Sequence, residues 1–91
     1  MKHNIYFEGK VQSLGLTTVE GTATVGVISQ GKFTFSTSSE ERMIVTSGML
    51  MVKLPGQNWK PMRKNAEWVV PANSSFEVEA DADVSYICYY K

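Results

Sequence analysis

The sequence lacks a second cysteine, an excess of charge and any long apolar run. Cys88 is the one cysteine among 91 residues, so no internal disulfide framework can form. Nine lysine and arginine residues balance nine aspartate and glutamate residues, whereas a broad nucleic-acid surface needs a basic excess. The apolar stretch at 49–52 is too short to span a membrane, and residues 1–10 lack the apolar run of a signal peptide. We therefore expect a cytoplasmic protein that binds neither nucleic acid nor membranes.

Histidine is almost absent as well. His3 is the only histidine, and it lies close to the start of the chain. Hydrolysis by a serine–histidine–aspartate triad and activation of Cys88 by a base both require a well-placed imidazole. Transition-metal sites require several converging histidine, cysteine or carboxylate ligands. The composition therefore argues against both chemistries, and we expect a protein without a metal ion or another cofactor.

The sequence does contain a succession of short, alternating apolar patterns. In residues 76–80, for example, apolar and acidic residues alternate, which is typical of a strand. Residues 84–90 are apolar on both faces, which indicates that both faces are covered. Turn residues separate such runs, and residues 30–31 and 81–83 are expected to form hairpins. We predict one all-β domain over residues 1–91, built as a sandwich or barrel.

One stretch has the spacing of a metal-binding β-barrel motif. Glu41 is followed by six residues and Gly48, and Phe35 and Thr37 stand one residue apart upstream of Glu41. Further along, a proline is followed five residues later by Phe76. These spacings resemble the two motifs of the cupin family, in which histidines occupy the positions of Phe35, Thr37 and Phe76. The resemblance implies a cupin-type barrel, a double-stranded β-helix or jelly-roll, whose three histidine ligands have been replaced.

Two phenylalanines at ligand positions make the predicted pocket aromatic. Side chains alternate between the two faces of a strand, so Phe33 and Thr37 face inward if Phe35 does. An aromatic pocket without metal ligands suits a flat organic ligand. The same rings could instead fill the interior of a small barrel, as inward aromatic side chains commonly do.

A narrower resemblance extends over almost the whole chain. Its ordered phrases are YFEGKVQSLG at 6–15, ATVGV at 23–27, FTFST at 33–37, SGMLMVKLPG at 47–56, Trp59, VPANSSF at 70–76 and SYICYY at 85–90. Together they resemble the small cupins known as pyrimidine/purine nucleoside phosphorylases, although Asn65 stands where these proteins tend to carry glycine. The resemblance implies a pentosyltransferase that converts a broad range of nucleosides and orthophosphate into free base and pentose 1-phosphate. It also implies a homodimer.

Phosphorolysis of a nucleoside makes three demands on a site, which must hold phosphate, stabilise a cationic sugar and hold a flat base. We predict that Lys10 holds the phosphate. Glu41 is expected to support the sugar, either through the ribose hydroxyls or by its charge. The base is expected to stack on aromatic side chains, which tolerate any base. The predicted substrate-binding residues are Phe35, Thr37, Phe76 and Tyr86.

Simpler interpretations of the same residues remain open. Lys10 could be a solvated lysine at a strand edge, and Glu41 could be a solvated loop charge. Tyr86 faces the pocket only if it shares a face with Val84 and Cys88. The alternative function is a non-catalytic, metal-free cupin that binds a small aromatic or sugar ligand, and a third possibility is a structural dimer.

Overall fold

The structure is a computed structural model that describes the whole chain, Met1–Lys91. It consists of ten strands and one short 3-10 helix, so the prediction of an all-β protein is confirmed. None of its helical segments is long and apolar enough to cross a membrane. In chain order, the elements are β1 (His3–Tyr6), η1 (Phe7–Gly9), β2 (Val11–Thr18), β3 (Gly21–Ile28), β4 (Gly31–Ser36), β5 (Glu41–Ser47), β6 (Leu50–Lys53), β7 (Lys60–Met62), β8 (Glu67–Val70), β9 (Ser75–Ala80) and β10 (Val84–Tyr90).

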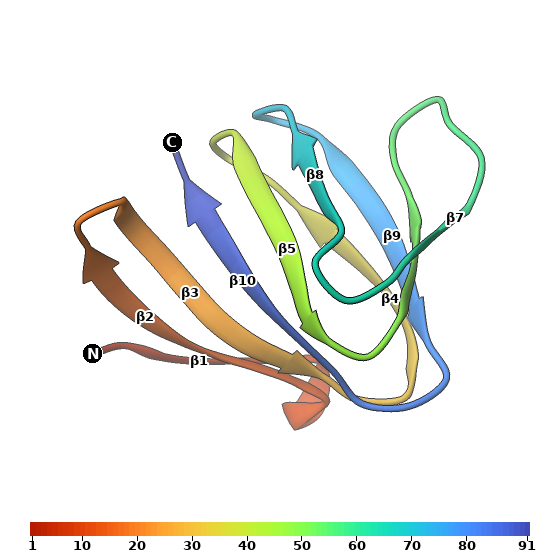
Figure 1. The fold of residues 1–91 in the computed structure, drawn as a ribbon, viewed down its shortest axis with the longest axis horizontal. Helices are drawn as coiled ribbons and strands as arrows, with labels where there is room; N and C mark the ends of the chain where they lie inside the picture. The colour runs from red at the N-terminus through yellow and green to blue at the C-terminus, as the bar shows by residue number, and fades with distance from the viewer.

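The strands form two sheets that face each other (Figure 1). The six-stranded sheet has the order β1-β2-β3-β10-β5-β8, and the four-stranded sheet has the order β4-β9-β6-β7. From β3 onward the chain alternates between the two sheets, apart from the β6–β7 pair. This alternation is the topology of a double-stranded β-helix, or jelly-roll, in agreement with the predicted barrel.

The hydrophobic core lies between the sheets and is built from alternate residues of the strands. In β9 the apolar residues of the 76–80 pattern are buried, and the glutamates between them are more exposed. In β10 the buried side chains are Val84, Tyr86 and Cys88. Tyr86 therefore shares the inward face with its two neighbours, which is the condition that its predicted role required.

The two hairpins predicted at residues 30–31 and 81–83 are wrong. The first turn leads from β3, which pairs with β2 and β10, to β4, which pairs with β9 in the other sheet. The second turn likewise leads from β9 to β10 across the two sheets. Turn-forming residues specify a local bend but not the partner of the next strand, so a hairpin and a sheet crossing look alike in sequence. The tight hairpin lies at residues 19–20, where Thr18 pairs with Gly21.

Two loop positions combine a motif residue with a left-handed backbone. Gly48 has a φ of +94°, and a Cβ on it would lie 3.0 Å from the carbonyl oxygen of Asp83. Glycine therefore suits this position both by its conformation and by the space available. Asn65 has a φ of +73°, and asparagine adopts this region more readily than most residues with a side chain. The departure from glycine at Asn65 thus keeps the local conformation.

Candidate functional site

A cavity of about 300 Å³ lies between the two sheets. Four of the six predicted site residues line it, namely Phe35, Glu41, Phe76 and Tyr86. They come from β4, β5, β9 and β10, so both sheets build the site. The other lining residues are Tyr6, Phe7, Ser13, Thr34, Ser36, Met43, Cys88 and Tyr90.

Phenylalanine rings form one wall of the cavity. Phe35 and Phe76 are direct cross-strand partners on β4 and β9, with ring centroids 5.6 Å apart. The ring of Phe7 meets Phe35 edge-on at a centroid distance of 5.7 Å and lies 4.9 Å from the ring of Phe33. Aromatic pairs in such arrangements contribute about 0.5–1.5 kcal/mol each beyond the burial of their area. The wall offers π faces on which a planar base could stack.

The position of Phe7 depends on an unusual turn between β1 and β2. Phe7, Glu8 and Gly9 have successive φ values of +52°, +57° and +89°. A left-handed backbone at a residue with a side chain is destabilising by about 1–3 kcal/mol and persists only where the surrounding structure enforces it. Here the turn sets the Phe7 ring against Phe33 and Phe35. Sequence reasoning missed Phe7, although it lies in the phrase YFEGKVQSLG, because a left-handed turn leaves no periodic signal.

Glu41 is the only carboxylate that lines the cavity, and its side chain is half-buried. The Cys88 thiol donates a hydrogen bond to Oε1 of Glu41, with 3.4 Å between sulfur and oxygen. Burial raises the pKa of Glu41, and the bond from Cys88 offsets part of that effect. Burial and the neighbouring Glu41 raise the pKa of Cys88 to about 12. Cys88 therefore remains a protonated thiol near neutral pH and is a poor nucleophile.

Two tyrosines line the cavity: Tyr86 is buried, and Tyr90 is 39% exposed. Burial raises the pKa of both Tyr86 and Tyr90 above the ordinary tyrosine value, so both remain protonated hydrogen-bond donors. The Tyr90 hydroxyl lies 3.0 Å from Oγ1 of Thr24. Tyr86 lies opposite Gly26 of β3, where a Cβ would come within 2.5 Å of the tyrosine ring and hydroxyl. The glycine at this position makes room for the inward ring.

Thr37 lies beside the cavity but does not line it. Its hydroxyl donates to the carbonyl oxygen of Pro71 at 2.7 Å and accepts from the N–H of Ser74 at 3.0 Å. Thr37 thus anchors the turn that precedes β9 and, with it, the strand that carries Phe76. A direct contact between Thr37 and the substrate stays a prediction.

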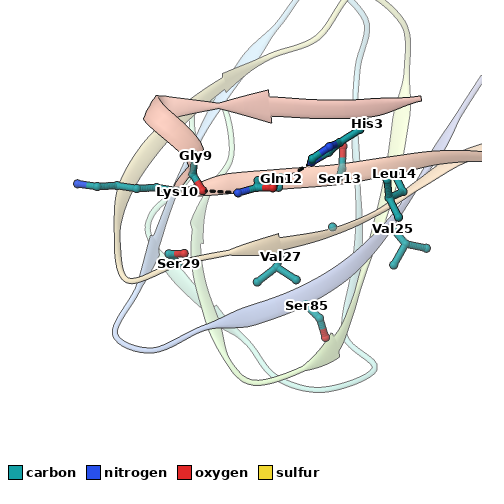
Figure 2. Close-up of a pocket in the computed structure, with 11 residues that line it drawn as sticks. His3, Gly9, Lys10, Gln12, Ser13, Leu14, Val25, Val27, Ser29 and Ser85 are labelled. Atoms are coloured by element: carbon teal, nitrogen blue, oxygen red, sulfur yellow. Dashed lines mark hydrogen bonds between the residues drawn. The ribbon is translucent and has the colours of Figure 1, made fainter. Parts of the chain in front are cut away.

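Lys10 lies away from the other five predicted residues. Its side chain is exposed, and it borders a separate depression of about 500 Å³ on the outer face of the six-stranded sheet. Figure 2 shows the Lys10 side chain extending away from the other residues around this depression. The structure does not bring Lys10 to the cavity between the sheets, and its predicted contact with phosphate stays a prediction.

The cavity is lined by aromatic rings, by hydroxyl groups and by a single carboxylate. No lysine, arginine or histidine lines it. No three histidine, cysteine, aspartate or glutamate side chains are grouped closely enough to bind a metal ion together. The arrangement can hold a planar group against aromatic rings, donate hydrogen bonds from hydroxyls and place one carboxylate beside a developing positive charge. That the protein needs no cofactor stays a prediction.

Comparison with known sequences finds the family to which these features belong. The sequence profile of the pyrimidine/purine nucleoside phosphorylase family matches residues 1–90. The chain belongs to this family. The pyrimidine/purine nucleoside phosphorylase of Pseudomonas fluorescens is 43% identical over 91 residues, which cover 99% of this chain and 97% of that protein. The family predicted from the ordered sequence phrases is thus confirmed.

Solved structures show the same fold. A crystal structure of a protein of unknown function from Vibrio parahaemolyticus matches with a TM-score of 0.93 at 38% identity, covering 99% of this chain and 97% of that one. An RmlC-like cupin from Shewanella frigidimarina matches with a TM-score of 0.75 at 14% identity, covering 96% and 79%. The second match concerns the fold alone, and it confirms the predicted cupin-type barrel.

Proposed function

We propose that this member of the family is a pyrimidine/purine nucleoside phosphorylase, a pentosyltransferase that converts a nucleoside and orthophosphate into free base and pentose 1-phosphate. The family match over residues 1–90 carries the proposal, since a relative of nearly equal length bears the name of this activity. The cavity supports it, because a stacking surface for a planar base lies beside a single carboxylate.

A broad substrate range follows from the way in which the base would be held. Phe35 and Phe76 offer ring faces, and stacking on an aromatic ring contributes about 1–3 kcal/mol per base whatever the base is. A site that instead read the base edge through buried hydrogen bonds would discriminate between bases by orders of magnitude. Purine and pyrimidine nucleosides are therefore both proposed as substrates.

Glu41 is proposed to act on the sugar. Positive charge develops on the sugar ring as its bond to the base breaks. A fixed carboxylate in a partly dry site stabilises that charge more strongly than a solvated one does. Tyr86 and Tyr90 add hydroxyl donors for the sugar or for the leaving base. Because burial raises the pKa of Glu41, acidification removes its carboxylate form at a higher pH than for an ordinary glutamate, and activity should fall accordingly.

Phosphate-dependent release of base tests this function. Uridine, inosine, adenosine and guanosine are incubated with and without orthophosphate in the presence of a metal chelator, and free base and pentose 1-phosphate are measured. We expect release only with phosphate, in equal amounts of the two products. The variants Phe35→Ala and Glu41→Ala should lose most activity, whereas Lys53→Ala, outside the cavity, should keep it. Release without phosphate would indicate hydrolysis, and no release would favour the ligand-binding alternative.

We also propose that the protein is a cytoplasmic homodimer that associates through the outer face of the six-stranded sheet. On this face Leu14, Val25 and Val27 are 45%, 45% and 47% exposed. Leu14 and Val25 are direct cross-strand partners, and all three side chains border the depression in Figure 2. Contiguous exposed apolar surface is typical of protein interfaces, and two copies of one patch match each other about a two-fold axis.

Sedimentation velocity tests the dimer. The wild type is expected to sediment as a dimer, and Val25→Asp should shift it to monomer because the new charge would be buried at the interface. Val19→Asp is the matched control, since Val19 is fully exposed in the turn between β2 and β3. A monomeric wild type would contradict this part of the proposal, and cell fractionation tests the location.

A further inference from the structure

The cavity between the sheets offers no positive charge to orthophosphate. Its lining contains no cationic side chain, and its one ionisable carboxylate, Glu41, would repel an anion. Proteins hold phosphate with cations and with clustered hydroxyl and N–H donors. A phosphorylase nevertheless has to bring phosphate next to the sugar. A phosphate site that contains a cation therefore has to lie outside this cavity and next to it.

A second hollow, of about 630 Å³, adjoins the cavity at the ends of β2, β3 and β10. The two spaces share Tyr6 and Tyr90 in their walls. No aspartate or glutamate lines the hollow, whereas Lys2 does. It is therefore the neighbouring space that is electrostatically suited to an anion.

The backbone directs Lys2 to the inner face of the six-stranded sheet. The N–H of Gly15 donates to the carbonyl oxygen of Lys2 at 2.7 Å, so Lys2 extends the pairing of β1 with β2. A Cβ on Gly15, which shares the inward face of β2 with Ser13, would lie 3.7 Å from the Cβ of Lys2. Asn4 lies two residues further along the same face, and its Nδ2 donates to Oγ of Ser13 at 3.2 Å. Lys2 takes part in none of the three ion pairs of the protein.

Threonine hydroxyl groups line the hollow on the side of Tyr90. Thr17, Thr22 and Thr24 line it, and Thr17 and Thr22 are cross-strand partners on β2 and β3. Oγ1 of Thr24 lies 3.0 Å from the Tyr90 hydroxyl. Tyr90 in turn pairs with Glu41 in the register of β10 and β5. Tyr90, which lines both spaces, thus lies between the hydroxyl groups of the hollow and the strand position of Glu41.

We propose that this hollow is the orthophosphate subsite, with Lys2 as its cation and the hydroxyls of Thr22 and Thr24 as hydrogen-bond donors. The proposal rests on the phosphorylase function proposed above. A phosphate oxygen forms a bond to the anomeric carbon of the sugar while the bond from that carbon to the base nitrogen breaks. The electron pair of the broken bond leaves with the base, and the base takes up, through water, the proton that hydrogen phosphate loses when it becomes the ester. The products are pentose 1-phosphate and free base.

Steady-state kinetics with varied orthophosphate and saturating nucleoside test the subsite. Lys2→Gln is expected to raise the KM for phosphate about tenfold, since it removes a charge-assisted contact, and to leave the KM for nucleoside unchanged. Lys2→Arg should restore most of the phosphate affinity, because it restores the charge. Thr22→Val should raise the KM for phosphate by a smaller factor. Lys53→Gln on β6 is the matched control and should behave as the wild type.

Two kinetic results would overturn the subsite. One is a phosphate KM in Lys2→Gln equal to that of the wild type, and the other is a rise in Lys10→Gln without one in Lys2→Gln. Absence of phosphorolysis in the wild type would instead contradict the proposed function. In that case calorimetric titration with inorganic phosphate tests the subsite. Binding that Lys2→Gln abolishes would support the subsite, and absence of binding to the wild type would overturn it.

Discussion

Substitution of Phe7 separates two opposing contributions to the turn between β1 and β2. Phe7→Ala removes a ring whose centroid lies 4.9 Å from that of Phe33 and 5.7 Å from that of Phe35. At about 0.5–1.5 kcal/mol per aromatic pair, the two lost contacts amount to about 1–3 kcal/mol. Phe7→Gly loses the same ring but accepts the φ of +52° without strain. The glycine variant should therefore be more stable than the alanine variant by about 1 kcal/mol, the reverse of the usual order.

Thermal unfolding of the two variants measures this difference. In a domain of this size, 1 kcal/mol corresponds to about 4–8 °C in Tm, so the order of the variants is readily resolved. An alanine variant as stable as the glycine variant would refute the argument, because the turn would then not be strained. Val19→Ala is a suitable control, since Val19 is fully exposed and its replacement should leave Tm unchanged.

The same two variants test whether Phe7 belongs to the binding wall. Loss of a stacking face contributing about 1–3 kcal/mol would raise the KM for nucleosides by about 5- to 150-fold. Phe7→Ala and Phe7→Gly should show the same rise, because both lack the ring, although their stabilities differ. An unchanged KM in both variants, measured below their Tm, would mean that Phe7 only covers the core.

Three further predictions concern the buried groups around the cavity. Glu41→Gln removes a carboxylate whose pKa burial raises. It should therefore raise Tm at neutral pH. This gain should disappear below the ordinary pKa of 4.5, where glutamate is protonated in both the folded and the unfolded protein. A gain in Tm that grows on acidification would contradict burial as the cause. Cys88, with a pKa of about 12, should react with iodoacetamide far more slowly in the folded protein than in urea, and Cys88→Ala should retain phosphorolysis. Gly26→Ala should destabilise the fold by about 1–3 kcal/mol and lower activity, because its Cβ would displace the Tyr86 ring; unfolding and kinetic assays at one temperature check both effects.

The fold was predictable where the sequence carries a periodic signal. Alternation over residues 76–80 marks an inward face, and the structure confirms it. Residues 84–90 are apolar on both faces, so the sequence left the direction of Tyr86 open, and the structure turns it inward. The sheet crossings at residues 30–31 and 81–83 were not predictable, because strand partners in a jelly-roll are distant in sequence. The pairing of Phe35 with Phe76, for example, joins strands that four other strands separate along the chain. No local turn signal contains that information.

The sequence predicted the candidate site residues that lie on regular strands, but not those around the turn at residues 7–10. Motif spacing identified Phe35, Glu41 and Phe76, which strand register then brings to one cavity. Phe7 and Lys10 lie at the two ends of a turn of left-handed residues. Alternation counted along a strand does not continue through such a turn, so the inward position of Phe7 and the outward position of Lys10 could not be read from the sequence.

The spacing of the cupin motifs can persist without the histidine ligands, because some motif positions are needed by the backbone and others only present a side chain to the interior. Gly48 is required by the backbone, since it combines a φ of +94° with a close approach to Asp83. Phe35 and Phe76 stand at positions where the cupin motifs carry histidines. At these two positions the exchange changes the side chain and leaves the backbone as it is. Their rings pack against each other at 5.6 Å as cross-strand partners, so the exchange fills the interior without altering the register of β4 and β9. Glu41, the first residue of β5, lines a cavity that both sheets build, so the spacing of a metal-binding motif here surrounds an aromatic pocket with a single carboxylate.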